Sequence, residues 1–423
     1  MQVFKFGGAS VKDADSVKNV SSILKRFASE PTIVVISAMG KITNKLEELV
    51  QAYMSRQTNT EAILSEIKVF HHQILDTLFR DKNHPVFNEI ENVFVEILWI
   101  LEEEPSFSFN HHYDQIVAQG EILSTKIVSA YLNNDGLKNK WLDARGIIQT
   151  DNSYREGKVD YELSANLVHT QLLPLFKTQQ LVLTQGFIGG TSENYTTTLG
   201  REGSDYTAAL LAYFTDAKQV TIWKDVPGVL NADPKYFKNT RKIDELTYHD
   251  AIELTYFGAS VIHPKTIKPL QNKNIPLYVK SFLKPEEPGT LIKEGEKGNS
   301  ITSYIFKEGQ ILLSIQPKDF SFIAEDNLST IFNLFSKYNV HIHMMQNSAI
   351  SFSVCTDNDV QKIEPLIHEL QQQFKVLYNT NVQLMTIRNY DQETVARLSE
   401  NKIILIEQRS RHTHQMVIKD ENS

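Results

Sequence analysis

Lys5-Phe6-Gly7-Gly8-Ala9-Ser10 is the stretch that decides the fold, because it joins a predicted strand to a predicted helix through a pair of glycines. The strand is Gln2 to Phe6, and the amphipathic segment Ala14 to Phe27 predicts the helix. Glycines let the main chain approach a polyphosphate, N–H groups at a helix start bind anions, and a lysine adds a point charge. Taken alone, a glycine pair after a strand is more often an ordinary turn, and the stretch matches neither of the common phosphate-loop patterns.

Strands and helices alternate outward from this stretch. Thr32 to Ser37 is almost continuously apolar, and two more strands are predicted at Leu181 to Thr184 and at Gln219 to Trp223. The segment from Leu49 to Leu132 is mostly helical. Apolar strands that alternate with helices are typical of a parallel sheet with both faces covered. We therefore predict an α/β domain over residues 1–295, with a mainly parallel sheet sandwiched by helices.

The pattern changes after Lys284 to Gly298, which is rich in proline, glycine and charge and indicates a domain boundary. Beyond it, strands and helices follow in the order β-α-β-β-α, which is typical of a ferredoxin-like α+β sandwich. We place this second domain at residues 305–380. Residues 381–423 form a shorter β-rich segment whose only predicted helix is Gln392 to Leu398.

The composition of the 423-residue chain narrows the functional classes. A net charge of -8 argues against a surface built mainly to bind nucleic acid. Cys355 is the single cysteine, which excludes an internal disulfide framework and a multi-cysteine metal site. The first residues show no secretory signal, and no apolar run reaches the roughly eighteen residues of a membrane span. We therefore expect a cytoplasmic protein with no membrane partner.

Two further motifs carry polar groups after predicted strands. Thr196–Thr207 (TTTLGREGSDYT) gathers hydroxyls, glycines, an arginine and an aspartate ahead of an apolar helix. Its Arg201 can hold a carboxylate through two parallel hydrogen bonds. Trp223–Lys235 (WKDVPGVLNADPK) contains the turn signals Pro-Gly and Asp-Pro and, alone, is most often a long connection. Ligands of open α/β sheets gather at the carboxyl ends of strands, so both motifs are candidates for a binding site.

Residue types also predict where three helices begin. Asn44 with Glu47 fits a capping box, and Ser204 is a plausible N-cap. Glu121, in the segment Gln119–Ser124, is predicted near a helix start, where a first-turn glutamate is favoured by the helix dipole. The helix dipole would therefore account for Glu121 without any ligand.

In this order along the chain, KFGG[ST], SA…TN, GE..S, TTLGR.GSDYTA, W.DV.G….DP and FGA.V.HP resemble the aspartate kinases of the amino-acid-kinase fold. The resemblance is close over Met1 to Ile292 and looser beyond. It implies phosphorylation of the side-chain carboxylate of L-aspartate by ATP with Mg²⁺, giving 4-phospho-L-aspartate. In the family this is the first step towards lysine, threonine and methionine.

The resemblance also implies the residues of the site. Lys5 and Asp205 would be catalytic. Aspartate would bind between Thr43, Glu121, Phe187, Arg201 and Ser204, with Arg201 on the α-carboxylate and Glu121 on the α-ammonium. The nucleotide would contact Lys5, Gly7, Gly8, Lys224, Asp225, Lys235 and Ser260. The acceptor carboxylate, with a pKa of about 4, is already ionised at neutral pH, so no general base is expected and no side chain is assigned as a metal ligand.

Two residues depart from the family pattern. Glu202 stands where a small or neutral residue is usual, and Ser260 replaces a lysine that touches nucleotide. Lys224 is the candidate for the missing charge. These departures keep open a catalytically weak, effector-binding regulatory subunit. A kinase of the same fold acting on glutamate, acetylglutamate or UMP is the other alternative.

Residues 305–380 resemble the ACT regulatory module of this family, and residues 381–423 resemble a shortened second copy of it. Such modules pair between subunits. The resemblance therefore implies a homodimer formed through this region. Lysine-inhibited relatives carry acids near His343 and Ala349, and this sequence has neither acid. His341 and His343 alternate along a predicted strand, where exposed strand histidines are a simpler explanation than a metal pair.

Overall fold

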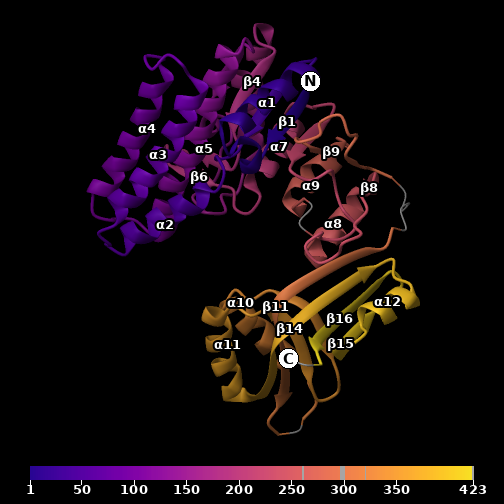
Figure 1. The fold of residues 1–423 in the computed structure, drawn as a ribbon. Coiled ribbons are helices and arrows are strands. Elements are labelled where there is room, and N and C mark those ends of the chain that lie inside the picture. Colours follow the sequence, from indigo (N-terminus) through magenta and orange to yellow (C-terminus); the bar gives the residue numbers. More distant parts are fainter. Residues whose placement is uncertain (260–261, 296–300, 320, 422–423) are drawn as a thin grey trace. The chain divides into compact units, whose positions relative to one another are not determined.

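The computed structural model describes residues 1–259, 262–295, 301–319 and 321–421 (Figure 1). Two compact units make up the chain, and each is described by itself. The first comprises Met1–Val229, Lys242–Ile252 and the described residues 262–295. The second comprises Leu230–Arg241, the described residues 253–259, and those from 301 onward. Among the described residues, no helix is both long and apolar enough to cross a membrane.

The first unit is built on an eight-stranded sheet. In sheet order its strands are β3 (Asn139–Leu142), β4 (Leu181–Gln185), β2 (Thr32–Ile36), β1 (Gln2–Phe6), β7 (Val220–Lys224), β9 (Leu277–Ser281), β10 (Thr290–Lys293) and β8 (Glu245–Thr247). All neighbouring pairs run parallel except β9 with β10. The predicted mainly parallel sheet is thus confirmed.

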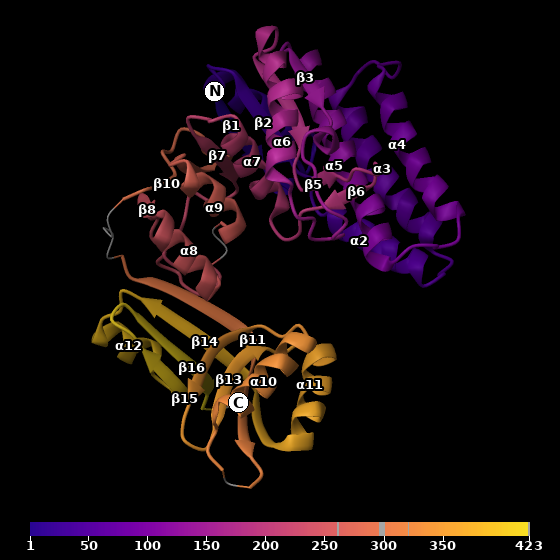
Figure 2. The same cartoon turned by 180° about the vertical axis from the view of Figure 1, so that it is seen from behind.

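Helices cover both faces of this sheet (Figures 1 and 2). Those of the first unit are α1 (Ala14–Phe27), α2 (Ile42–Met54), α3 (Thr60–Leu78), α4 (Val86–Glu102), α5 (Phe109–Asn134), α6 (Tyr161–Leu167), α7 (Gly203–Phe214) and α9 (Pro264–Asn272). Helix α8 (Tyr248–Phe257) belongs in part to each unit. A short hairpin of β5 (Ile188–Gly190) and β6 (Thr196–Thr198) leads into α7.

The pleat of β1 decides which side chains meet each layer. Phe4 and Phe6 point into a buried apolar cluster shared with α1 to α5. Lys5 lies between them in sequence and points to the opposite face, where α7 packs against β1. On the neighbouring strand, Trp223 stacks on Phe6 with ring centroids 6.0 Å apart, so Lys224 faces the same way as Lys5. The alternation therefore aims two lysines at α7.

The three predicted helix starts were wrong. Helix α2 begins at Ile42 after Lys41, because Ile42 N–H already bonds back to the Met39 carbonyl, so the predicted cap Asn44 lies inside the helix. Helix α7 begins at Gly203, and Ser204 makes no cap bond. Glu121 is twelve residues into a 26-residue helix capped by Ser108, so the helix dipole does not explain it.

The second unit contains a six-stranded antiparallel sheet. In sheet order its strands are β12 (Ile342–Asn347), β13 (Phe352–Asp357), β11 (Ser303–Pro317), β14 (Phe374–Arg388), β16 (Thr413–Asp420) and β15 (Lys402–Arg409). Helices α10 (Glu325–Lys337), α11 (Val360–Gln373) and α12 (Gln392–Leu398) complete it. The predicted β-α-β-β-α order and the short last helix are confirmed.

One polar cluster of the second unit involves a residue that the sequence pattern did not point to. His343 on β12 lies 3.0 Å from Asp357 on β13, and its other ring nitrogen lies 3.1 Å from the Lys307 ammonium. An acid therefore lies beside His343 in space, although none is near it in sequence.

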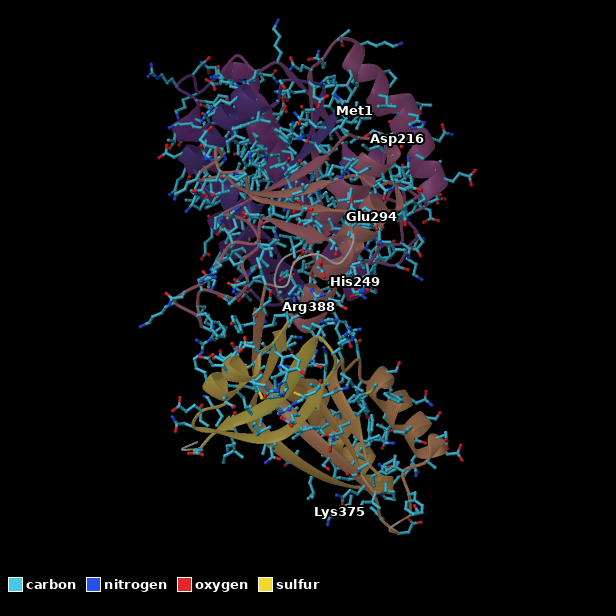
Figure 3. The ribbon with its side chains drawn as sticks, turned by 90° about the vertical axis from the view of Figure 1, so that its right-hand side faces the viewer. Met1, Asp216, His249, Glu294, Lys375 and Arg388 are labelled. Atoms are coloured by element: carbon cyan, nitrogen blue, oxygen red, sulfur yellow. The ribbon has the colours of Figure 1, made fainter. Side chains whose placement is uncertain are left out.

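A second ion pair of this unit lies at the end of β14. Arg388, which is labelled in Figure 3, pairs with Glu253 at 2.5 Å.

Candidate active site

The loops after β1 and β2 form a close main-chain cradle at the carboxyl edge of the first sheet. The Gly40 N–H donates to the Gly8 carbonyl at 3.0 Å, and the Ser37 N–H donates to the Phe6 carbonyl at 3.1 Å. A Cβ at Gly8 would lie 2.8 Å from the carbonyl oxygens of both Ala38 and Gly40. Only glycine fits there, as a main-chain surface for phosphate requires.

Lys5, Asp205 and Lys224 form a charge cluster beside this cradle, in which Lys5 and Asp205 are buried and Lys224 is half-buried. The Lys5 ammonium lies 2.6 Å from one carboxylate oxygen of Asp205, and the Lys224 ammonium lies 3.7 Å from the other. Asp205 is in the first turn of α7 and is 3% exposed. Burial opposes its ionisation, but Lys5 and Lys224 outweigh burial and hold the pKa of Asp205 below its ordinary value. The cluster carries one net positive charge, suited to an anion.

Lys5 also shapes the space over the glycines. A Cβ at Gly7 would lie 3.3 Å from the Lys5 ammonium. Glycine at this position therefore leaves room for the ammonium group. The ion pair with Asp205 holds the Lys5 ammonium in this place. Both oxygens of Asp205 face ammonium groups, so its carboxylate is not arranged to bind a cation directly.

Glu121 on α5 is the unusual acid of the site. It is 3% exposed, and among the described residues its Oε2 atom has no hydrogen-bond partner. Burial raises its pKa to about 8, against the opposing effects of the Ala38 main-chain N–H and the Lys5 charge. Native proteins rarely leave a buried carboxyl oxygen without a partner, so this atom is suited to a ligand that brings a donor or a positive charge.

Thr43 lies in the first turn of α2, which packs against α5. A Cβ at Gly120 would lie 2.8 Å from a methyl group of Leu46, so the glycine before Glu121 allows the two helices to approach closely. Thr43 is partly exposed. The packing thus sets one predicted substrate residue on each of two helices in contact.

Phe187 and Ser204 are held together by two tight glycine contacts. A Cβ at Gly186 would lie 2.5 Å from the Ser204 Cβ, and one at Gly203 would lie 2.8 Å from the Phe187 ring. Phe187 has a φ of 71°, a left-handed conformation that bulky residues rarely adopt. Its N–H donates to the Thr207 hydroxyl at 3.0 Å, which ties this backbone to α7. Strain of this kind is concentrated at functional sites.

Arg201 and Glu202 lie on the turn before α7. Arg201 is exposed, and its guanidinium makes no hydrogen bond or ion pair with any residue that the structure describes. Glu202 has a φ of 54°, and its carboxylate accepts a hydrogen bond of 2.9 Å from the main-chain N–H of His263 at the start of α9. Glu202 therefore bonds to the start of α9 and does not pair with the Arg201 guanidinium.

Of the three remaining predicted nucleotide residues, only Asp225 is a described residue of the first unit. Asp225 is exposed after the end of β7. Lys235 belongs to the second unit, where its ammonium lies 3.1 Å from the Tyr236 hydroxyl. Ser260 lies outside the described residues. The predicted roles of these residues stay predictions.

A separate cleft of about 690 Å³ lies between α2, α3 and α5 and is lined by residues that include Glu47, Tyr113 and Arg155. None of the predicted site residues that the structure describes lines this cleft. Sequence reasoning also missed Asp114, which is fully buried on α5. Its spacing of seven residues from Glu121, two helical turns on the same helix, was the available signal.

Comparisons with known proteins agree with this geometry. The model of the amino acid kinase family matches residues 1–281. Lysine-sensitive aspartokinase 3 of Escherichia coli (strain K12) is 32% identical over 84% of this chain and 78% of the relative. The chloroplastic aspartokinase 1 of Arabidopsis thaliana is 33% identical, over 84% of this chain and 63% of that protein.

Solved structures give the same result. Aspartokinase III from E. coli, in complex with aspartate and ADP in its R-state, superposes with a TM-score of 0.85 at 28% identity, covering 100% of this chain and 97% of that one. The aspartate kinase of Clostridium acetobutylicum shares the fold, with a TM-score of 0.78 at 22% identity over 99% and 96% of the two chains. The chain therefore belongs to the amino acid kinase family and, within it, to the aspartokinases.

Proposed function

We propose that this chain transfers the γ-phosphoryl group of ATP to the side-chain carboxylate of L-aspartate, giving 4-phospho-L-aspartate and ADP. The observation that carries the proposal is the unpartnered Oε2 of Glu121, buried within electrostatic reach of Lys5. It offers a place for an α-ammonium beside a positively charged cradle. Aspartokinase III from E. coli was solved with aspartate and ADP, which supports the same pair of ligands.

The residues divide the reaction between them. An aspartate side-chain oxygen attacks the γ-phosphorus, and the bond from that phosphorus to the β,γ-bridging oxygen breaks. The acceptor is already a carboxylate, so no proton has to be removed. Lys5, held by Asp205, would neutralise charge that develops on the transferring group, and main-chain N–H groups near Gly8 would hold the phosphates.

The residues also fit the implied cofactor. Gly8 makes a cradle that a Cβ would fill, and two lysines lie beside it. Mg²⁺, when bound with ATP, would neutralise phosphate oxygens, and it commonly keeps several waters and few protein ligands. The arrangement of Asp205 between two ammonium groups agrees with a metal carried mainly by the nucleotide.

Arg201 and Glu121 favour an amino-acid acceptor. An exposed guanidinium can bind the α-carboxylate with two hydrogen bonds, and a buried carboxylate can take the α-ammonium. UMP has neither group and acetylglutamate has no free ammonium, so Glu121 disfavours both. Glutamate differs by one methylene, which a pocket rejects only about 10- to 200-fold.

A hydroxamate assay tests the proposal directly. Purified protein with ATP, Mg²⁺ and hydroxylamine should give aspartyl hydroxamate, and parallel ADP release should be much slower with glutamate, acetylglutamate or UMP. Faster turnover of another acceptor would redirect the proposal within the family. Aspartate binding without any acyl phosphate would favour the regulatory-subunit alternative.

We further propose that the second unit is an ACT-type regulatory region that joins two copies of the chain. Strand β12 is at the edge of its sheet, Met345 on it is 50% exposed, and the nearby Ile350 is 52% exposed. Open edge strands pair readily with another chain. Light scattering should give twice the chain mass, and Met345→Lys should weaken the dimer; a monomer at micromolar concentration would contradict this.

The product of the proposed reaction, 4-phospho-L-aspartate, would feed the synthesis of lysine, threonine and methionine.

A further inference from the structure

Asp114 on α5 is a buried carboxylate that accepts three hydrogen bonds, two from strand β6 and one from the loop of Arg155. It is fully buried, and its Oδ1 accepts from the Thr198 hydroxyl at 2.7 Å. Its Oδ2 accepts from the main-chain N–H groups of Thr198 and Arg155, both at 2.9 Å. Burial raises the pKa of Asp114 to about 6, and these hydrogen bonds oppose the rise. So many donors on one buried acid indicate a structural junction.

The neighbouring Gln115 extends this junction along strand β6. Its side-chain amide donates to the Thr196 carbonyl at 2.8 Å and accepts from the Thr196 N–H at 3.0 Å. Two consecutive residues of α5 therefore bond to the edge of β6 that β5 does not pair. Strand β6 lies beside α5 (Figure 2). Helix α5 thus supplies hydrogen bonds that a third strand would otherwise make. These bonds fix the position of β6 along the axis of α5.

The same strand leads straight into the amino-acid-binding turn. Arg201 follows Thr198 by three residues, and the Leu199 N–H between them donates to the Phe187 carbonyl at 2.8 Å. The loop of Arg155 packs on this segment as well, because Gly157 N–H donates to the Thr198 carbonyl at 2.9 Å. The turn that carries Arg201 is thus held from both sides.

Asp114 and Glu121 lie seven residues apart on one face of α5, about two turns and roughly 10 Å along the helix. We propose that Asp114 is a positioning residue for the amino-acid substrate: through Thr198 it sets the distance between Arg201 and Glu121. A single rigid helix then spans both recognition groups. The inference rests on the proposed function, since it assumes that Arg201 and Glu121 hold the two ends of aspartate.

Thr198→Val tests the inference without altering the charge of the core. The change removes one donor to Asp114 at nearly constant shape, whereas Thr198→Ser keeps that donor. A matched control is Thr197→Val, which removes an equally buried hydroxyl, bonded at 2.6 Å to Thr150 and not to Asp114. Asp114→Asn is a stronger variant, and its folding should be checked by circular dichroism.

We expect Thr198→Val to raise the KM for aspartate roughly tenfold, because small displacements of a positioning group are costly. The KM for ATP should stay within about twofold, and Thr198→Ser and Thr197→Val should resemble the parent. Equal rises in both KM values, or a rise in Thr197→Val as large as that in Thr198→Val, would overturn the inference.

Calorimetric binding of aspartate to the same variants separates this inference from the proposed function. If the parent protein binds aspartate without phosphorylating it, the proposed reaction fails, and the Kd values of Thr198→Val and Thr198→Ser still decide the role of Asp114. If the parent phosphorylates aspartate and both Thr198 variants bind it equally well, the positioning role fails alone.

Discussion

The two sides of the active site differ in how their charges are satisfied before any ligand arrives. On the phosphate side, Lys5 and Lys224 share the carboxylate of Asp205. On the amino-acid side, Glu121 has an oxygen without a partner and Arg201 is exposed. The first side is preorganised, and its groups need not move when charge develops in transfer. The second side is completed only by a substrate that brings both an ammonium and a carboxylate.

Lys5→Ala removes the central charge of the preorganised side and should have the largest effect. We expect kcat to fall about a thousandfold, because a cation aimed at a transferring phosphoryl group has effects of this order. The KM for aspartate should change far less. Steady-state ADP release measures both constants. Lys18→Ala, which removes an exposed lysine paired with Asp15, is the control. A rise in the aspartate KM with an unchanged kcat would mean that Lys5 serves the amino-acid side of the site and not the phosphate side.

Glu121→Gln removes the buried acid of the amino-acid side. The KM for aspartate should rise about 10- to 100-fold, because a hydrogen bond to a charged group contributes roughly 1.5–3 kcal/mol. The KM for ATP should stay nearly constant. Isothermal titration with each ligand separates the two effects. Equal weakening of ATP and aspartate would mean that Glu121 supports the whole site and does not recognise the ammonium.

The raised pKa of Glu121 gives a pH dependence whose sign is fixed. Below about pH 8 the ligand-free carboxyl is protonated, so binding an ammonium requires loss of a proton. The KM for aspartate should therefore fall by up to about tenfold per pH unit as pH rises to 8, and then level off. The KM measured from pH 6 to 9 in Glu121→Gln should lose this slope.

The same group predicts an opposite trend in stability. The folded state holds a proton on Glu121 up to about pH 8, whereas the unfolded state releases it near the ordinary value of 4.5. Burial of this acid therefore costs stability progressively as pH rises between those values, on the order of a few kcal/mol at the upper end. In thermal melts without ligand, Glu121→Gln should gain on the parent from pH 5 to 8.5. A constant difference in Tm would show that Glu121 does not titrate in this window.

Lys224→Ala should have a moderate effect on the preorganised side. Its ammonium is farther from Asp205 than that of Lys5, so Lys5 should keep its orientation in the variant. We expect the KM for ATP to rise about tenfold while kcat falls less than in Lys5→Ala. ATP titrations at saturating aspartate measure this. An unchanged KM for ATP would remove Lys224 from nucleotide binding.

The sequence predicted the framework better than the charges within it. The bounds of β1 and α1 follow from local apolar periodicity, and the structure has them as predicted. The capping residues misled, because Asn44, Ser204 and Glu121 were judged by local preference, whereas tertiary packing decides where α2, α7 and α5 begin.

Pairs that are distant in sequence could not be predicted. Asp114 meets Thr198 across 84 positions, and Asp357 meets His343 through the pairing of two strands. A single sequence states which residues are charged but not which of them folding leaves without a partner. The difference between the two sides of the site is therefore a property of the structure, although every residue in it had been a candidate.

Glu202, which follows Arg201 in the sequence, gives the smallest expected effect. Its carboxylate bonds to the His263 N–H where α9 begins, and a negative charge at a helix start is favourable. Glu202→Ala should therefore cost about 1 kcal/mol of stability, and Glu202→Gln, which keeps an acceptor, no more than about half of that. With kcat within about twofold in both variants, thermal melts and the hydroxamate assay would assign Glu202 to α9. A large change in kcat with an unchanged Tm would instead give this departure from the family pattern a part in the reaction, and would revive the catalytically weak alternative that it first suggested.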